Sequence, residues 1–428
     1  MSTIYSDHES QVRSYARSFP ADFVRASGSR MFARDGRSYL DFLAGCGSLN
    51  YGHNHAAIKS ALLGYIAADG PAMGLDLQTE AKERFIRSMQ DIILEPRGLD
   101  YRLQFTGPTG ANAVEAAIKL ARKKTGRTGV IAFTNAFHGC SLGALSLTGS
   151  GYHRASSIPL LNGVMRMPYE GYFGGDIDTS AMLDKMLDDP SSGIDKPAAI
   201  ILELVQGEGG LNVASSTWLK RIAETARRHG ALLIVDDIQA GCGRAGTFFS
   251  FEGSGVVPDI VVLAKSISGF GLPMALMLLR REIDIWGPGE HNGTFRGNSH
   301  AFVTAAAAFE TFWADEQFAA GIARKAELLG EGLANLGAPY GFRVKGRGLM
   351  QGIDMGSGAL CAAARKAAFE AGLIVEACGP DDEVLKLMPP LTVSEPELIE
   401  AFGILGQSLA DATANEPGAA GAAHVASA

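Results

Sequence analysis

Two stretches near the middle of the chain decide the fold, ALLIVD (residues 231–236) and DIVVLAK (residues 259–265). Each is a nearly continuous apolar run that ends in a charged residue, which is typical of strands buried on both faces. Similar runs predict strands at 129–133, 198–204 and 274–279. Helical patterns lie between the runs, at 111–124 and at 217–229, and the second ends in basic residues followed by glycine. This alternation predicts an α/β layer with a mostly parallel central sheet flanked by helices.

The pattern of apolar and polar residues changes after about residue 302. A long Ala-rich helical stretch passes through Trp313 and Leu328, and strand patterns follow at 342–344, 349–353 and 373–376. We expect a smaller α+β domain built from the N- and C-terminal segments. The predicted division is 1–75 for the N-terminal part of the small domain, 76–310 for the large domain, 311–411 for the C-terminal part of the small domain, and 412–428 for a disordered Ala/Gly-rich tail.

Length and charge exclude several classes of protein. A chain of 428 residues, 46% hydrophobic and 20% charged, is typical of a globular enzyme of two or more lobes. The net charge of −8 argues against a nucleic-acid partner. The apolar runs are too short to span a bilayer, and residues 1–13 lack a signal core, so a cytoplasmic location is expected. The five cysteines and nine histidines are scattered, and we expect no metal site.

Two charged residues stand where predicted strands end. Asp236 follows an apolar strand at the edge where α/β sheets bind ligands, although alone it also fits a helix cap or a turn. Lys265 leads from a buried strand into a Gly/Ser loop, where its amine can meet a ligand and, once neutral, form a Schiff base. Taken alone, it also fits a surface lysine.

Two further segments favour a ligand with an anionic group. Thr109, Gly110 and Ala111 stand at the start of a predicted helix, where outward backbone amides and the helix dipole attract an anion. Phe137 and His138 follow the predicted strand 129–133, and the Phe137 ring could stack on a planar ligand. An ordinary capped helix start and core packing are the plain alternatives.

Together these features describe a planar, basic, phosphorylated aldehyde, which is pyridoxal 5'-phosphate (PLP). Lys265 would bind its carbonyl carbon. Asp236 would pair with the ring nitrogen and keep it protonated. Residues 109–111 would hold the phosphate, and Phe137 would cover one face of the ring.

The sequence resembles the class III PLP-dependent aminotransferases. VDDIQAGCGR (235–244) and PDIVVLAK (258–265) carry the resemblance, which extends over residues 15–392. It implies a PLP-dependent transferase of fold type I, with His138 in the cofactor site and Gln239 at the ring hydroxyl. It also implies that Thr294, in GTFRGN (293–298), reaches the phosphate of a partner subunit. We therefore expect a homodimer or a higher homo-oligomer with shared active sites.

Within that family the chain is most similar to the diaminobutyrate–2-oxoglutarate aminotransferases of the ectoine type. The segments that carry this similarity are RSFP (17–20), QFTGPTG (104–110), MPYEGYFG (167–174), QGEGGLN (206–212) and GEHNGTFRGN (289–298). The implied reaction interconverts 2,4-diaminobutyrate plus 2-oxoglutarate with aspartate 4-semialdehyde plus glutamate. Ping-pong kinetics follow, with Lys265 as the base that moves the substrate proton.

Three residues are expected at the substrate. The resemblance matches Glu208 to a glutamate that pairs with a substrate-binding arginine, but this chain has Lys386 at the arginine position. A lysine offers a point charge rather than a bidentate fork for a carboxylate. Arg17 is a candidate for the distal carboxylate. Glu203 precedes a leucine where many relatives have proline, and the sequence suggests no function for that difference.

Other activities remain open at this point. The nearest are class III enzymes acting on ornithine, acetylornithine or 4-aminobutyrate, followed by a PLP-dependent racemase or decarboxylase. A regulatory protein of this fold is disfavoured because both Asp236 and Lys265 are present. A nicotinamide enzyme is disfavoured because no GxGxxG follows a first strand. Whether the product serves ectoine, siderophore or antibiotic synthesis is also open.

Overall fold

A seven-stranded sheet forms the centre of the computed structural model, which describes residues 3–175 and 177–414. Its strands lie in the order β4 (Tyr101–Phe105), β12 (Leu276–Arg280), β11 (Ile260–Leu263), β10 (Leu232–Asp236), β7 (Ala199–Leu202), β5 (Val130–Phe133) and β6 (Val164–Met167). Strand β12 is antiparallel to both of its neighbours, and the other pairings are parallel. The predicted mostly parallel, buried sheet is therefore confirmed.

Helices cover this sheet where the sequence predicts them. Helix α6 (Gly110–Thr125) begins where Thr109 caps it, since the Thr109 hydroxyl accepts from the Asn112 amide, and it ends at Gly126 with φ of 70°. Helix α10 (Ser216–His229) likewise ends at a left-handed glycine. The predicted apolar stripe of α6 is buried, so packing against the sheet stabilises a helix that caps define at both ends.

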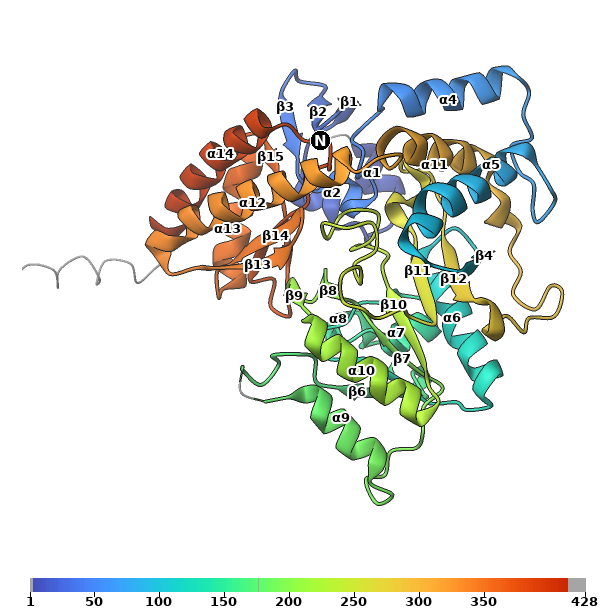
Figure 1. Ribbon diagram of the computed structural model, residues 1–428. Helices are drawn as coiled ribbons and strands as arrows, with labels where there is room; N and C mark the ends of the chain where they lie inside the picture. Colours follow the sequence, from blue (N-terminus) through green and yellow to red (C-terminus); the bar gives the residue numbers. More distant parts are fainter. Residues whose placement is uncertain (1–2, 176, 415–428) are drawn as a thin grey trace, which may run out of the picture.

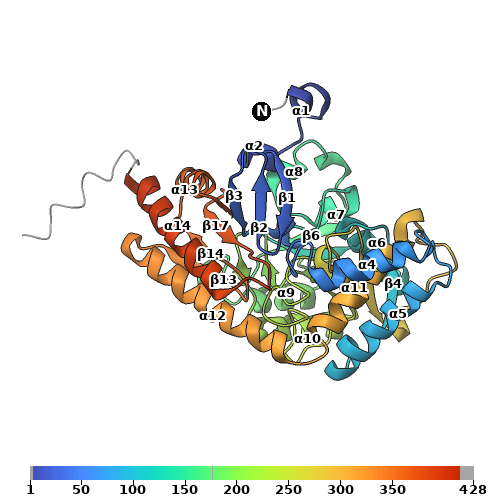
Figure 2. The same ribbon diagram turned by 90° about the horizontal axis from the view of Figure 1, so that it is seen from above.

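The N- and C-terminal segments form the smaller part of the molecule together. One sheet joins β1 (Phe23–Ser27), β2 (Arg30–Ala33) and β3 (Ser38–Asp41) to β15 (Leu373–Ile374). A second sheet has the order β13 (Arg343–Arg347), β14 (Met350–Asp354), β17 (Val384–Leu387) and β16 (Glu376–Cys378). Helices α12 (Gln317–Gly337), α13 (Gly358–Glu370) and α14 (Glu395–Ala414) lie beside these strands (Figures 1 and 2). The expected α+β domain of terminal segments is thus confirmed.

The remaining helices and strands belong to neither of the groups described above. They are α1 (Thr3–His8), α2 (Tyr15–Ser18), α3 (Ala44–Gly47), α4 (Ala56–Ala67), α5 (Glu80–Ser88), α7 (Leu142–Leu147), α8 (Gly151–Arg154), α9 (Thr179–Asp188), α11 (Ser299–Phe312), β8 (Val205–Gln206) and β9 (Asn212–Val213). A single π-helical turn, Met89–Leu94, follows α5.

Two expectations about the C-terminal half need correction. The Ala-rich stretch is two helices, α11 and α12, because Trp313 leaves the helix to pack in the core and donates to Tyr51 Oη at 2.8 Å. Asp315 then accepts from the Gln317 amide at 2.9 Å, where α12 starts. Helix α14 runs to Ala414 and so includes the first three residues of the predicted tail; residues 415–428 lie outside the described part.

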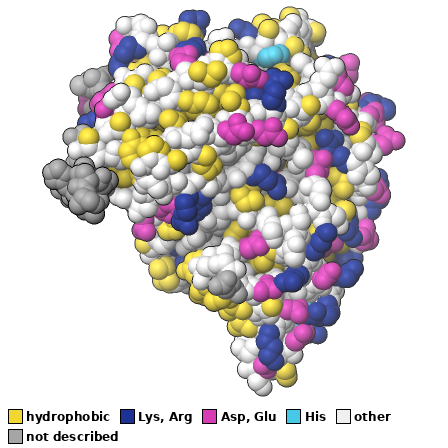
Figure 3. Space-filling model, turned by 60° about the vertical axis from the view of Figure 1, so that its left-hand side comes forward, with side chains coloured by type: hydrophobic (Ala, Val, Ile, Leu, Met, Phe, Trp, Pro, Cys, Tyr) yellow, Lys and Arg dark blue, Asp and Glu magenta, His cyan; other side chains and the backbone are white. Residues whose placement is uncertain are grey.

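The surface adds one observation on partners. On the face shown in Figure 3, basic and acidic side chains alternate without a broad area of one sign. That face offers no basic surface of the kind that nucleic acid needs. Among the described residues, no helix combines the length and the apolar character required to cross a membrane.

Candidate active site

A cavity of about 460 Å³ lies at the carboxyl end of the central sheet. The ends of β5, β7, β10 and β11 and the start of α6 contribute to its wall, as ligand sites in parallel sheets do. Nine of the twelve predicted site residues line it: Thr109, Gly110, Ala111, Phe137, His138, Glu208, Asp236, Gln239 and Lys265.

Lys265 reaches this cavity from an uncommon backbone conformation. Strand β11 ends at Leu263, and Lys265 begins a short 3-10 turn with φ of 51°. A left-handed conformation is unfavourable for lysine, and such strain gathers at functional sites. Lys265 Nζ lies 4.0 Å from Cys46 Sγ, so a second segment of the chain comes close to it.

Asp236 is a fixed carboxylate at the end of β10, the parallel neighbour of β11. It is 3% exposed, its Oδ1 accepts from the Ile238 amide at 3.1 Å, and its Oδ2 lies 2.7 Å from His138 Nδ1. Burial alone would lower the pKa of His138, but the hydrogen bond and charge of Asp236 outweigh it and raise that pKa. The pair holds the carboxylate in one orientation toward the cavity.

The start of α6 forms an anion site beside it. The first amides of a helix have no partner within the helix, and the dipole adds positive potential there. Gly139 lies against this turn with φ of 128°, and a Cβ on it would come within 2.7 Å of the Ala111 Cβ. Glycine therefore lets the 137–139 loop close against the first turn of α6.

Gln239 brings an acceptor without a partner to the wall of the same cavity. Its Nε2 donates to Glu208 Oε1 at 3.1 Å, whereas its Oε1 is buried without a hydrogen-bond partner among the described residues. A buried unpaired oxygen costs free energy unless a ligand donates to it. An anion site, a fixed carboxylate, a lysine and this free acceptor together fit the phosphate, ring nitrogen, aldehyde and hydroxyl of PLP.

Glu203 is a cavity residue to which the sequence assigned no role. Its Oε2 accepts from the Phe137 amide at 3.0 Å, which fixes the loop that carries the Phe137 ring. Burial raises the pKa of Glu203 to about 7, although the charge of His138 opposes this. Phe137 is half-buried, and its ring lies edge-on to His153 at 5.5 Å.

Lys386 lies behind the cavity wall as a wholly buried cation. Its Nζ is 3.0 Å from Glu208 Oε1, 2.9 Å from Glu376 Oε2 and 3.2 Å from the Gly207 carbonyl oxygen. Burial disfavours the charged forms of both side chains, but their ion pairs outweigh burial. The pKa of Lys386 is therefore raised, and the pKa of Glu208 is held at about 2. The lysine is therefore cationic and already neutralised.

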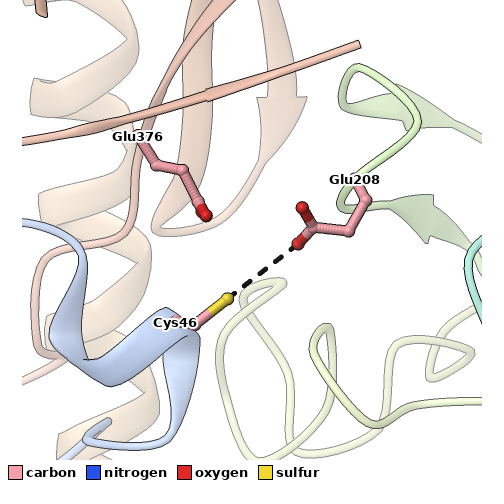
Figure 4. A group of neighbouring side chains, drawn as sticks. All are labelled: Cys46, Glu208 and Glu376. Atoms are coloured by element: carbon pink, nitrogen blue, oxygen red, sulfur yellow. Dashed lines mark hydrogen bonds between the residues drawn. The ribbon is translucent and has the colours of Figure 1, made fainter. Parts of the chain in front are cut away.

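Sequence reasoning missed three residues at this end, Tyr15, Cys46 and Glu376. Figure 4 shows Cys46 on α3, Glu208 in the turn between β8 and β9, and Glu376 on β16, with the three side chains pointing toward one another. Tyr15 Oη donates to Glu376 Oε1 at 2.9 Å and lies 3.3 Å from Cys46 Sγ. Only the pairing of distant segments brings these residues together, and no local pattern signals it.

Two predicted residues stand apart from the cavity. The Arg17 guanidinium is exposed and donates to the Gln11 backbone and side chain at 2.9 and 2.8 Å. Thr294 is exposed on a 3-10 turn, and the adjacent Gly293 lies beside Gly107 of the loop before α6.

Known proteins resemble this chain over nearly its whole length. A family model described as aminotransferase class-III matches residues 12–409. A diaminobutyrate–2-oxoglutarate transaminase of Vibrio cholerae is 55% identical over 95% of this chain and 99% of its own, and one of Bordetella parapertussis is 50% identical over 97% of both.

Solved structures agree with these matches. The ornithine aminotransferase of Toxoplasma gondii, with PLP in partial occupancy at its active site, has a TM-score of 0.83 at 28% identity and covers 96% of this chain and 93% of its own. The N-acetylornithine aminotransferase of Stenotrophomonas maltophilia has a TM-score of 0.75 at 26% identity, covering 97% and 100%. With a fold of type I and a cavity that fits PLP, the chain belongs to the class III aminotransferases, which are PLP-dependent enzymes.

Proposed function

We propose that this enzyme transfers an amino group between L-2,4-diaminobutyrate and 2-oxoglutarate, giving L-aspartate 4-semialdehyde and L-glutamate by a ping-pong mechanism. The observation that carries the proposal is near-complete coverage, at 50–55% identity, by relatives that bear this activity in their names. The buried Lys386, in place of an arginine, agrees with the ectoine-type similarity of the sequence. An ectoine-type role in the cell is part of the same proposal.

Seven residues at one end of the cavity share the binding of the cofactor. Residues 109–111 bind the phosphate through backbone amides at the start of α6. Asp236, oriented by His138, would pair with the ring nitrogen, and Gln239 would accept from the ring hydroxyl. Phe137 covers one face of the ring.

Lys265 is the residue that we expect to transfer the substrate proton. Bound PLP supplies an electron sink for the negative charge that develops when the substrate carbon loses its proton. Lys265 would hold the cofactor at its aldehyde carbon, and in the reaction its amine would take that proton and return it. Its neighbour Cys46 is a neutral thiol, because burial raises the thiol pKa. Cys46 therefore does not trap the amine as an ion pair.

Three further assignments belong to this proposal. Thr294, exposed on its turn, reaches the phosphate of a partner subunit, so that the active enzyme is at least a homodimer. Arg17 would need to leave Gln11 to bind a distal carboxylate. The division into residues 1–75 and 311–411 as small domain and 76–310 as large domain fits the sheets that these segments form.

Amino-acceptor competition tests the proposal. With glutamate as donor, aspartate 4-semialdehyde is expected to outcompete succinate semialdehyde and glutamate semialdehyde. The structural likeness to an ornithine aminotransferase makes glutamate semialdehyde the informative competitor. Equal rates with the three acceptors would contradict the substrate assignment while leaving the family assignment intact.

A further inference from the structure

The backbone donors around the start of α6 are almost all in use. The Gly107 amide donates to Asn112 Oδ1 at 2.8 Å, and the Thr109 amide donates to the Gly107 carbonyl oxygen at 2.7 Å. The Asn112 amide donates to Thr109 Oγ1 at 3.2 Å, and the proline that follows Gly107 has no N–H. The amides of Gly110 and Ala111, the first two of the helix, have no partner within it. Both residues line the cavity, so these two amides are the ones left for an anion.

The cavity offers few other groups to a phosphate. Among the described residues that line it, Lys265 is the only lysine or arginine, and it is expected at the aldehyde of the cofactor. A phosphate would therefore be held by N–H groups rather than by a lysine or an arginine of this chain. A hydrogen bond weakens steeply as its angle closes, so binding depends on where the N–H bonds point. The affinity for the phosphate should thus depend on how firmly the first turn of α6 is oriented.

Asn112 fixes that orientation from inside the first turn. Its Oδ1 accepts from the Gly107 amide while its own amide is capped by the Thr109 hydroxyl, so the loop and the helix hold each other by reciprocal capping. The helix start is also pressed against the cavity wall, since a Cβ on Gly110 would come within 2.7 Å of the Ile238 Cδ1 atom. The side chain of Asn112 is therefore the link that sets the direction of the first two amides.

A histidine from a distant segment holds Asn112 in turn. His291 Nε2 lies 3.2 Å from Asn112 Oδ1, across 179 positions of the sequence. Because the Gly107 N–H requires the oxygen of the Asn112 amide to face it, the histidine nitrogen must be the donor. Burial and, after it, the charge of Lys119 lower the pKa of His291, so the ring is neutral near pH 7 and carries its hydrogen on Nε2.

The segment that carries His291 is fastened to the large domain. Trp286 Nε1 donates to Gln104 Oε1 at 2.7 Å, and Lys119 Nζ donates to the Glu290 carbonyl oxygen at 2.7 Å. One contact reaches β4 and the other reaches α6. The His291 ring is half-buried between these attachments, so it presents a donor in a fixed place.

We propose that Asn112 and His291 are positioning residues for the phosphate of the cofactor. His291 holds the side-chain amide of Asn112, Asn112 holds the loop at Gly107, and the amides of Gly110 and Ala111 are thereby aimed at the phosphate. The inference rests on the proposed function, which places the phosphate at the start of α6. It makes discrimination between a phosphorylated and an unphosphorylated cofactor depend on two residues that do not themselves bind the phosphate.

Pyridoxal isolates the group in question, since it has the ring, hydroxyl and aldehyde of PLP without the phosphate. Dissociation constants for both compounds are measured by titrating the cofactor-free enzyme and following visible absorbance. N112A is expected to weaken PLP binding about tenfold, because amides that donate to a charged group lose their alignment. Pyridoxal binding should stay the same, so the ratio of the two dissociation constants narrows.

Histidine variants test the second link. H291A is expected to weaken PLP binding about threefold and to leave pyridoxal binding unchanged, because Asn112 remains but loses one neutral hydrogen bond. H291Q should restore the wild-type ratio, since a glutamine amide can donate to Asn112 Oδ1. If N112A did not fold, the two histidine variants would carry the test by themselves.

Two exposed residues far along the chain supply matched controls. N335A, on α12, and H8A, on α1, should leave both dissociation constants unchanged. The thermal midpoint of each cofactor-free variant establishes that it is folded.

Two results would overturn the inference. In the first, N112A and H291A weaken PLP and pyridoxal by the same factor, which would make both residues parts of the fold only. In the second, both variants bind PLP as tightly as the wild type. Failure of the proposed phosphate position is a separate result, because the wild-type enzyme would then bind pyridoxal as tightly as PLP.

Discussion

Replacing Lys386 with methionine tests the buried ion cluster through protein stability. The substitution keeps an unbranched chain and removes the ammonium that separates Glu208 from Glu376. Removing one partner of a buried ion pair costs about 3–5 kcal/mol, because the remaining charge is left uncompensated. Glu208 is partly exposed and can turn toward water, so we expect a loss near the lower end, about 3 kcal/mol.

The stability loss of the K386M variant should depend on pH. The pKa of Glu208 is held at about 2, below its ordinary 4.5, so its contribution to stability is present above pH 4.5 and is lost as pH falls toward 2. Without the lysine, protonating a carboxylate relieves the repulsion. The loss of unfolding free energy in K386M, relative to wild type, should therefore be largest near pH 8 and smaller near pH 5.

Urea unfolding followed by circular dichroism, at fixed protein and PLP concentrations, measures the difference. K366M is the matched control, since the Lys366 side chain is 76% exposed and its ion pair with Glu370 spans 3.9 Å. Exposed pairs of this kind contribute about 0–1 kcal/mol. If K386M were as stable as K366M at pH 8, the buried cluster would not be charged as described.

Three further substitutions probe the cofactor end. D236A should keep the fold yet lose most turnover, and near-wild-type activity in a transamination assay would refute its role at the ring nitrogen. G139A places a methyl group 2.7 Å from the Ala111 Cβ at φ of 128°, so PLP titration should show weaker binding; unchanged affinity would count against the close approach. Burial holds the pKa of Glu203 at about 7, above its ordinary 4.5, so this side chain stabilises the fold below pH 4.5 and loses that contribution as pH rises to 7. The thermal midpoint of E203Q, relative to that of wild type, should therefore rise between pH 5 and pH 8. If the two midpoints changed equally with pH, the raised pKa of Glu203 would be refuted.

The sequence predicts well which residues gather at the cavity, because the cavity is built largely from strand ends. Asp236 and Lys265 each follow an apolar run that marks a buried strand, and parallel strands bring such ends to one edge of the sheet. Thr109 is the cap of a helix whose apolar stripe is visible in the sequence. In each case one local pattern fixes both the element and the position of the residue.

The ion cluster around Lys386 depends on contacts that no local pattern encodes. Strands β16 and β17 have three and four residues, too short for a periodic signal, yet their register sets Glu376 opposite Lys386. The Tyr15–Glu376 hydrogen bond joins positions 361 apart. The break between α11 and α12 was likewise invisible, because Trp313 leaves the helix for a tertiary contact with Tyr51.

The most direct test of the account is where the cofactor attaches. Borohydride treatment of the PLP-loaded enzyme, followed by peptide mass spectrometry, should find the reduced pyridoxyl group on Lys265. The K265A variant should carry no such label and have no visible cofactor absorbance. A label on another lysine, or one that persists in K265A, would contradict the central claim that Lys265 holds the cofactor and performs the chemistry.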